Sequence, residues 1–353
     1  MRLTLFPYNA NARILLQNRN NLVGYDIHSV CSFKEDERLL QQCAREYGVH
    51  VETDIIAVLK DTDGVLLVEP TRYTREQTYL PVIKSARLAD KAVLCSRDVF
   101  EKLAQLGVPE DAVTLLEKSP ACHAEQERIP LTKIPIPVIM VAGMGEDCDK
   151  FDVQFHLRRY LNEQGYRVCS ICSNAYGVVF GMYSLPLQLF DVHQTYEDRI
   201  VAVNQYVYDA CISEPSDVLV LGVPGSLSMI NSEYPNHFSE LPLIVTNAVE
   251  ADAGIVTFYF DAEYTDDFFE AYRQYCYYKY NIPLACMVLS RQRVTYSLES
   301  KRLDIYYLDD KRMKQYISDQ QIHPALLDLT DEEQRNSGFA ACVDMLAENP
   351  STL

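Results

Sequence analysis

Short runs of consecutive apolar residues, typical of buried strands, alternate along the chain with longer segments in which apolar residues recur every three or four positions, as on one face of a helix. In the first third of the chain, strands are predicted at 3–9, 24–32, 63–71, 91–96 and 112–118, with helices between them. This alternation implies parallel pairing of the strands, with helices on the faces of the sheet. Residues 1–125 are therefore predicted to form a small Rossmann-like domain.

A proline-rich segment follows this domain. Four prolines and little periodicity between 119 and 137 predict a linker, which is placed at 126–137. Beyond it, strands are predicted at 138–143, 166–173, 216–226, 243–248, 254–260, 286–291 and 303–309, and helices at 149–165, 197–213 and 265–281. This pattern predicts a second, larger α/β domain with a parallel sheet at 138–330, and an acidic helical tail at 331–353.

The segment 138–161 has the order of a phosphate-binding loop. A buried strand leads into a turn with Gly143 and Gly145, which is followed by Lys150 and an amphipathic helix. Backbone N–H groups of such a turn, a lysine and a helix N-terminus together hold phosphate. From Gly143 to Phe151 the pattern resembles the G-x-G-x-D-x-G-K-T loop of dethiobiotin-synthetase-like P-loop proteins, which implies a P-loop-like second domain.

Departures from that pattern predict a degenerate nucleotide site. Asp149 replaces the last glycine of the loop, and Phe151 replaces the Ser or Thr that ligates magnesium. With Glu146 and Asp147, the loop has three carboxylates against one lysine, Lys150, and these charges would repel a triphosphate.

The strand at 216–226 departs from the pattern in a similar way. A Walker-B carboxylate is expected after its apolar run, but Gly222 occupies that place and Asp217 lies at the start of the strand. We therefore expect a turn in which Lys150 pairs with Asp147 or Asp149, because a lysine beside carboxylates keeps its charge more easily with a partner.

Ligands of α/β proteins bind outside the C-terminal ends of the strands, so residues there are expected to form one site. The predicted members are Gly143, Gly145, Asp147, Asp149, Lys150, Ser173, Asn174, Gly222, Pro224 and Gly225.

Three ordered segments carry a family resemblance. They are LFPYN followed by a helix and GYDI, VAGMGEDCDKFDVQ with GYRV, and VLVLGVPGSLSMIN followed by TNAVEADAGIV. Over roughly residues 1–310 the chain resembles clostridial peptide-maturation-system proteins, found in gene clusters for bacteriocin-like, cysteine-rich peptide natural products. The resemblance implies an accessory protein in maturation of a ribosomally made peptide, with the precursor peptide or a radical-SAM maturase as its partner. The alternative is a nucleotide-dependent P-loop enzyme, using ATP or GTP, in the same pathway.

Composition narrows the set of partners. The 32 basic and 50 acidic residues give a net charge of −18, which disfavours nucleic acid and anionic membranes. Eleven cysteines without a secretory signal pattern predict a reducing cytoplasm. No cofactor is assigned, with a nucleotide left open.

The other residues considered for chemistry are predicted to have structural roles. Cys169 and Cys172 form a C-S-I-C pair at the end of a strand, without a second pair to complete a zinc site, so a structural role is favoured. No histidines have HxxxH or HExxH spacing, so no metal site is predicted. The tyrosine-rich run 272–280 is expected to pack on the sheet with its hydroxyls outward, with a peptide-binding face or a homodimer surface as alternatives.

In the first domain, Glu69 follows the strand that begins at residue 63, and it is expected to line a crevice near Pro7, Tyr8 and Asn9. No G-x-G-x-x-G follows the first strand, so dinucleotide binding there is not indicated.

Overall fold

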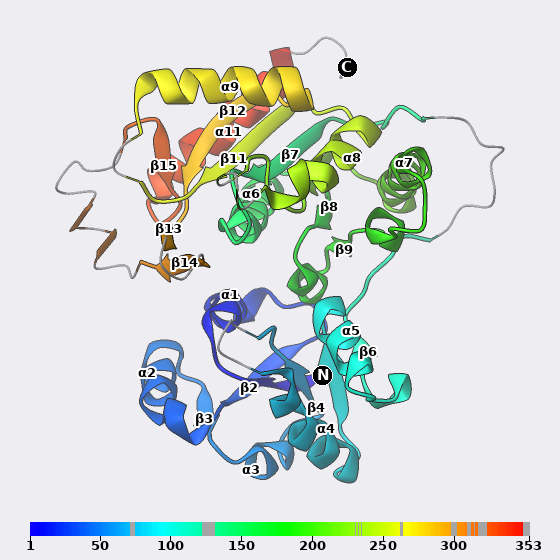
Figure 1. The fold of residues 1–353 in the computed structure, drawn as a ribbon, viewed down its shortest axis with the longest axis vertical. Helices are drawn as coiled ribbons and strands as arrows, with labels where there is room; N and C mark the ends of the chain where they lie inside the picture. The colour runs from blue at the N-terminus through cyan, green and yellow to red at the C-terminus, as the bar shows by residue number, and fades with distance from the viewer. Residues whose placement is uncertain are drawn as a thin grey trace. The chain divides into compact units, whose positions relative to one another are not determined.

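The computed structural model describes residues 1–70, 75–121, 131–229, 231, 233, 235–261, 264–297, 302–308, 312, 313, 315, 316 and 323–348. The chain divides into two compact units (Figure 1). The first unit is Met1–Lys118 with Asn174–Met182, and the second is Ser119–Ser173 with Tyr183–Leu353.

The first unit is built on a parallel sheet in the order β3-β2-β1-β4-β5-β6, which is the strand order of the Rossmann fold. Its strands are β1 (Arg2–Phe6), β2 (Asp26–Cys31), β3 (His50–Glu52), β4 (Gly64–Leu67), β5 (Ala92–Cys95) and β6 (Thr114–Leu115). Its α-helices are α1 (Arg13–Gln17), α2 (Glu37–Tyr47), α3 (Ile55–Leu59), α4 (Tyr79–Leu88) and α5 (Arg97–Gln105). The Rossmann-like prediction is confirmed.

The second unit contains a parallel sheet in the order β15-β12-β11-β7-β10-β8-β9. Its strands are β7 (Val138–Gly143), β8 (Val168–Cys172), β9 (Tyr183–Ser184), β10 (Val218–Gly222), β11 (Ala253–Phe258), β12 (Leu284–Leu289) and β15 (Leu326–Asp328), and β13 (Gln292–Ser297) and β14 (Arg302–Tyr307) pair separately as an antiparallel hairpin. Its α-helices include α6 (Lys150–Glu163), α7 (Tyr196–Ser213), α8 (Glu240–Ala248), α9 (Asp266–Tyr280) and α11 (Glu332–Glu348). The prediction of a second α/β domain with a parallel sheet is confirmed.

Alternate residues of β7 enter different cores on the two faces of this sheet, as expected for a central strand. Met140 lies in a core formed with residues of α7, α8 and α9, whereas Ile139 and Val141 lie in a core formed with residues of α6 and α11. Strand β7 is therefore buried on both sides, and the turn after it lies at the middle of the sheet edge.

Some predicted elements differ from the structure. The strand predicted at 243–248 is part of helix α8, which buries Ile244, Val245 and Ala248 at helical spacing. The predicted acidic tail contains α11, and its buried Phe339 and Cys342 belong to the core of the second unit rather than to an appendage.

The division into units also differs from the predicted boundaries. The first unit ends at Lys118 rather than at residue 125, and it includes Asn174–Met182 from the middle of the predicted second domain. In the predicted linker, residues 126–130 lie outside the described residues.

Candidate functional site

The turn between β7 and α6 is fixed at its start by backbone hydrogen bonds to two neighbouring segments. Met144 N–H donates to the carbonyl of Thr257 at 2.8 Å, which ties the turn to β11. Leu227 N–H donates to the Gly143 carbonyl at 3.0 Å, and Ser228 N–H to the Met144 carbonyl at 3.2 Å. The turn and the segment after β10 therefore form one backbone-bonded structure at the sheet edge.

Both glycines of the turn are required by close contacts rather than by positive φ. A Cβ atom on Gly145 would lie 2.2 Å from the hydroxyl oxygen of Tyr259, and one on Gly143 would lie 2.8 Å from the carbonyl oxygen of Gly145. The buried Tyr259 hydroxyl also donates a hydrogen bond to the Glu146 carbonyl. Tyr259 thus holds the turn against β11.

Backbone conformation in the second half of the turn alternates in sign. Asp147 has φ of 46° and Asp149 has φ of 53°, whereas Cys148 between them does not have positive φ. Such alternation turns successive N–H groups toward one side and forms an anion-binding concavity. Within the described residues, no acceptor bonds the backbone N–H groups from Glu146 to Lys150. These donors lie at the N-terminus of α6, where the helix dipole also favours an anion.

Lys150 is held by a carbonyl and not by a carboxylate. Its ammonium group donates a hydrogen bond to the carbonyl of Gly225, and desolvation lowers the pKa of the lysine. The predicted pairing with Asp147 or Asp149 is wrong, since in the described part of the chain neither carboxylate forms an ion pair with Lys150. The Asp147 residue is exposed instead.

Asp149 points its carboxylate toward the end of β12. The carboxylate accepts hydrogen bonds from the Ser290 hydroxyl and the Arg291 N–H, both at 2.7 Å, and from the Gln292 amide at 3.4 Å. Burial raises the pKa of Asp149, and these hydrogen bonds oppose the rise. The residue that replaces a glycine in the expected pattern therefore anchors the turn to β12.

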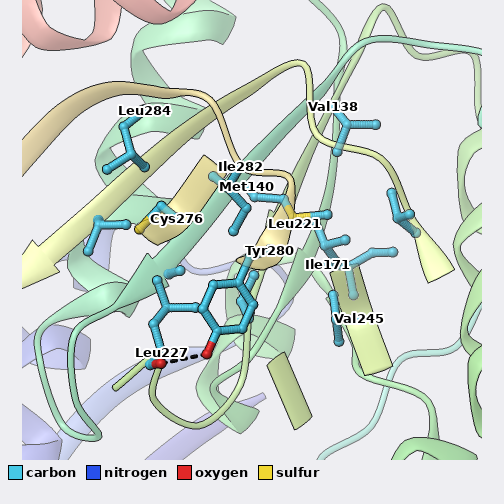
Figure 2. Packing of buried hydrophobic residues seen from close by; sticks show 14 of the residues in the cluster. Val138, Met140, Ile171, Leu221, Leu227, Val245, Cys276, Tyr280, Ile282 and Leu284 are labelled. Carbon is cyan, nitrogen blue, oxygen red and sulfur yellow. Dashed lines mark hydrogen bonds between the residues drawn. The ribbon is translucent and has the colours of Figure 1, made fainter. Parts of the chain in front are cut away.

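The segment after β10 is held by the tyrosine-rich helix α9. The Leu227 carbonyl accepts hydrogen bonds from the hydroxyls of Tyr280 at 2.5 Å and Tyr275 at 2.8 Å, and Figure 2 shows the first of these. A further hydroxyl, that of Tyr272, shares a hydrogen bond of 2.8 Å with the Ser228 hydroxyl. These tyrosines pack on the sheet as predicted. The expectation that their hydroxyls point outward is wrong for Tyr272, Tyr275 and Tyr280, because these hydroxyls bind the segment whose Gly225 carbonyl accepts a hydrogen bond from Lys150.

Ser226 lies within this segment, between the residue that binds Lys150 and the residue that binds Gly143. The serine is 1% exposed, and its hydroxyl has no hydrogen-bond partner among the described residues. An unpartnered buried hydroxyl is costly to the fold.

The remaining predicted site residues do not all belong to the second unit. A Cβ atom on Gly222 would lie 2.3 Å from the Gln154 side chain, whose oxygen is 3.5 Å from the Ser173 N–H donor. Pro224 lies between Gly222 and Gly225 in the segment after β10. Asn174 belongs to the first unit instead, where its side chain accepts a hydrogen bond from the Tyr176 N–H.

Sequence reasoning missed Gln154 and Tyr259. Gln154 is 1% exposed on helix α6, and its amide donates to the Ile171 carbonyl at 3.0 Å. The sequence did contain a signal for Gln154, because a glutamine at a buried position of an amphipathic helix is unusual. Tyr259 had no such signal, because its role depends on β11 lying beside β7.

The residue positions expected to hold magnesium lack suitable ligands. Phe151 is buried, with 7% of its surface exposed. At the other end of β10, Asp217 accepts three hydrogen bonds from the backbone and guanidinium of Arg167, at 2.6–2.9 Å, which lower the pKa of the aspartate to about 2. Both observations agree with the departures seen in the sequence.

The predicted crevice residues of the first unit lie together. The Asn9 amide donates to the Glu69 carbonyl at 2.8 Å, while Tyr8 and the preceding Pro7 follow β1 directly. The Glu69 N–H donates to the hydroxyl of the buried Tyr176 at 2.6 Å. Tyr176, from the segment 174–182, thus accepts a hydrogen bond from a backbone N–H group at the sheet edge where Rossmann folds bind dinucleotides.

The remaining candidate chemistry is not supported by the described residues. Cys169 and Cys172 are buried, and neither forms a disulfide within the described residues. The described part of the chain contains no group of three or more His, Cys, Asp or Glu side chains suited to a metal ion. None of its helices has the length and apolar character needed to cross a membrane.

The chain is similar in fold to a solved structure that matches it over nearly its whole length. A DUF1611 family protein from Anabaena variabilis matches with a TM-score of 0.64 and 15% identity, over 99% of each chain. A probable dehydrogenase from Thermotoga maritima matches with a TM-score of 0.27 and 14% identity, over 59% of this chain and 55% of that one, and a superposition so poor carries no inference. No protein-family model and no curated protein matches the chain.

This match corrects the resemblances drawn from the sequence. The full-length fold similarity is to a DUF1611 family protein, so the assignment to a clostridial peptide-maturation family is wrong, and the likeness to dethiobiotin synthetases is not retained.

Proposed function

We propose that the second unit binds a nucleotide through a phosphate group at the turn from Gly143 to Lys150. The observation that carries this proposal is the set of unpaired backbone N–H groups from Glu146 to Lys150, at the N-terminus of a helix and at the C-terminal edge of a central parallel strand. A phosphate supplies acceptors for several such donors at once.

Lys150 supports the same proposal. An ammonium group has three N–H donors, and the Gly225 carbonyl accepts from only one of them. Two donors therefore remain for phosphate oxygens without any rearrangement of the Gly225 contact.

The peptide-maturation role depended on a family resemblance that is now overturned, and no contact in the described residues points to a peptide. The buried hydroxyls of the tyrosine-rich helix are engaged with the segment after β10, which leaves only outward-facing tyrosines such as Tyr277 and Tyr278 for a partner.

Isothermal titration calorimetry tests the proposal with adenine and guanine mono-, di- and triphosphates, each with and without magnesium. We expect saturable binding of at least one nucleotide, no binding of the corresponding nucleoside, and a loss of about tenfold or more in affinity for Lys150→Met. Lys60→Met removes the same charge from an exposed position of the first unit and is the matched control. The absence of binding by every nucleotide, or binding that Lys150→Met leaves unchanged, would contradict the proposal.

A further inference from the structure

We infer that the phosphate is bound as a free dianion, without a divalent cation, so that the ligand is a phosphate monoester or a diphosphate diester rather than a magnesium triphosphate. This inference rests on the proposed function, and it names the class of ligand that the same site takes.

The first step is the chemistry of the donors around the turn. The backbone N–H groups from Glu146 to Lys150 and the Lys150 ammonium are all hydrogen-bond donors suited to an anion. Magnesium instead requires oxygen ligands in near-octahedral geometry. The side chain directly after Lys150, where a hydroxyl would ligate magnesium, is the buried ring of Phe151.

The second step concerns the carboxylates near the turn. Asp149 is engaged by Ser290, Arg291 and Gln292, and Asp217 is engaged by Arg167 at the other end of β10. The Asp149 carboxylate is therefore bonded to the segment after β12, and Asp217 lies at the opposite end of β10 from the turn.

Glu146 and Asp147 remain, and both are exposed. In the absence of a bridging cation, their charges repel the phosphate from a short distance. Only one lysine, Lys150, offsets them in the turn, so the site favours an anion of low charge. A free triphosphate has about four negative charges and is disfavoured by the same Coulomb interaction.

Binding of a free anion and binding through a bridging cation predict opposite effects of replacing Glu146 or Asp147 with a neutral side chain. If the phosphate is bound as a free anion, Asp147→Asn removes repulsion and tightens binding, by about two- to tenfold at low salt. If the carboxylates hold a cation that bridges to phosphate, the same substitution weakens binding. Asparagine tolerates the positive φ of this position, so the substitution preserves the backbone.

The experiment measures the Kd of AMP, GMP, ADP-ribose and ATP by calorimetry, in buffer with EDTA and in buffer with magnesium, for the natural chain, Asp147→Asn and Glu146→Gln. We expect a monophosphate or ADP-ribose to bind with a Kd that magnesium changes by less than about threefold, free ATP to bind more weakly, and both variants to bind more tightly. A larger gain with magnesium, or equal or weaker binding by Asp147→Asn, would overturn the inference while leaving phosphate binding intact. No binding of any nucleotide in either buffer would instead contradict the proposed function.

Discussion

Replacing Gly145 with alanine tests the packing that shapes the phosphate turn. The new Cβ atom would lie 2.2–2.4 Å from the hydroxyl oxygen and two ring carbons of Tyr259, which is far inside van der Waals contact. Gly145 does not have positive φ, so the backbone adds no strain and the whole cost comes from this contact. The ring must move, and its hydrogen bond to the Glu146 carbonyl is then lost.

The magnitude follows from those two effects. Overpacking a filled site costs about 1–3 kcal/mol, and loss of one hydrogen bond costs about 1 kcal/mol, so Gly145→Ala is expected to destabilise the second unit by about 2–4 kcal/mol. Tyr259→Ala alone removes a buried ring and costs about 3–5 kcal/mol. In the double variant the added methyl group meets no ring, so its cost disappears and the double variant is as stable as Tyr259→Ala.

Hydrogen exchange followed by mass spectrometry measures these values on peptides from β7 and β11. A local measurement is needed because a chain with two units need not unfold in one step. The expected coupling energy between the two substitutions is about 2–4 kcal/mol. The reasoning is refuted if Gly145→Ala changes the free energy of opening by less than about 0.5 kcal/mol, or if its cost is the same with Tyr259 and with Ala at 259.

Three further predictions concern stability. Burial and nearby arginines lower the pKa of His156 from 6.5 to about 4, so the unfolded state binds the proton first as pH falls. The contribution of His156 to the free energy of unfolding is therefore complete above about pH 6.5 and declines toward pH 4, by about 3 kcal/mol at most. His156→Gln should flatten this decline in acid unfolding curves, and an unchanged pH profile would contradict the prediction. Tyr280→Phe should cost no more than about 1 kcal/mol in urea unfolding, because the Leu227 carbonyl keeps two other donors, and a loss above about 2 kcal/mol would show that these do not suffice. Lys150→Met should leave the urea midpoint unchanged or raise it, since desolvation disfavours the charged lysine, and a lower midpoint would mean that the charge stabilises the fold.

Much of the fold follows from local pattern. Buried strands such as β7 and β10 are continuous apolar runs, and the periodic segments between strands became helices, so both parallel sheets were predictable. The segment 243–248 was misassigned because a short apolar run resembles a buried strand, although Ile244, Val245 and Ala248 have helical spacing. No local signal shows that Asn174–Met182 packs within the first unit, since that depends on contacts far apart in the chain.

The candidate site was predictable in position but not in its contacts. Glycines, a lysine and a helix start identified the turn at 143–150. The partners of its charged groups were wrong, because Lys150 contacts a carbonyl 75 positions away, and Asp149 contacts a hydroxyl 141 positions away. Nearness in sequence suggested an ion pair, whereas Asp149 is bonded to the segment after the end of β12.

The most direct test of phosphate binding at this turn is a crystal structure of the protein with the tightest-binding nucleotide. We expect the phosphate oxygens to lie within about 3 Å of the backbone nitrogens of Asp147, Cys148 and Asp149 and of the Lys150 ammonium nitrogen. A nucleotide held elsewhere, with these N–H groups still without an acceptor from it, would contradict the account.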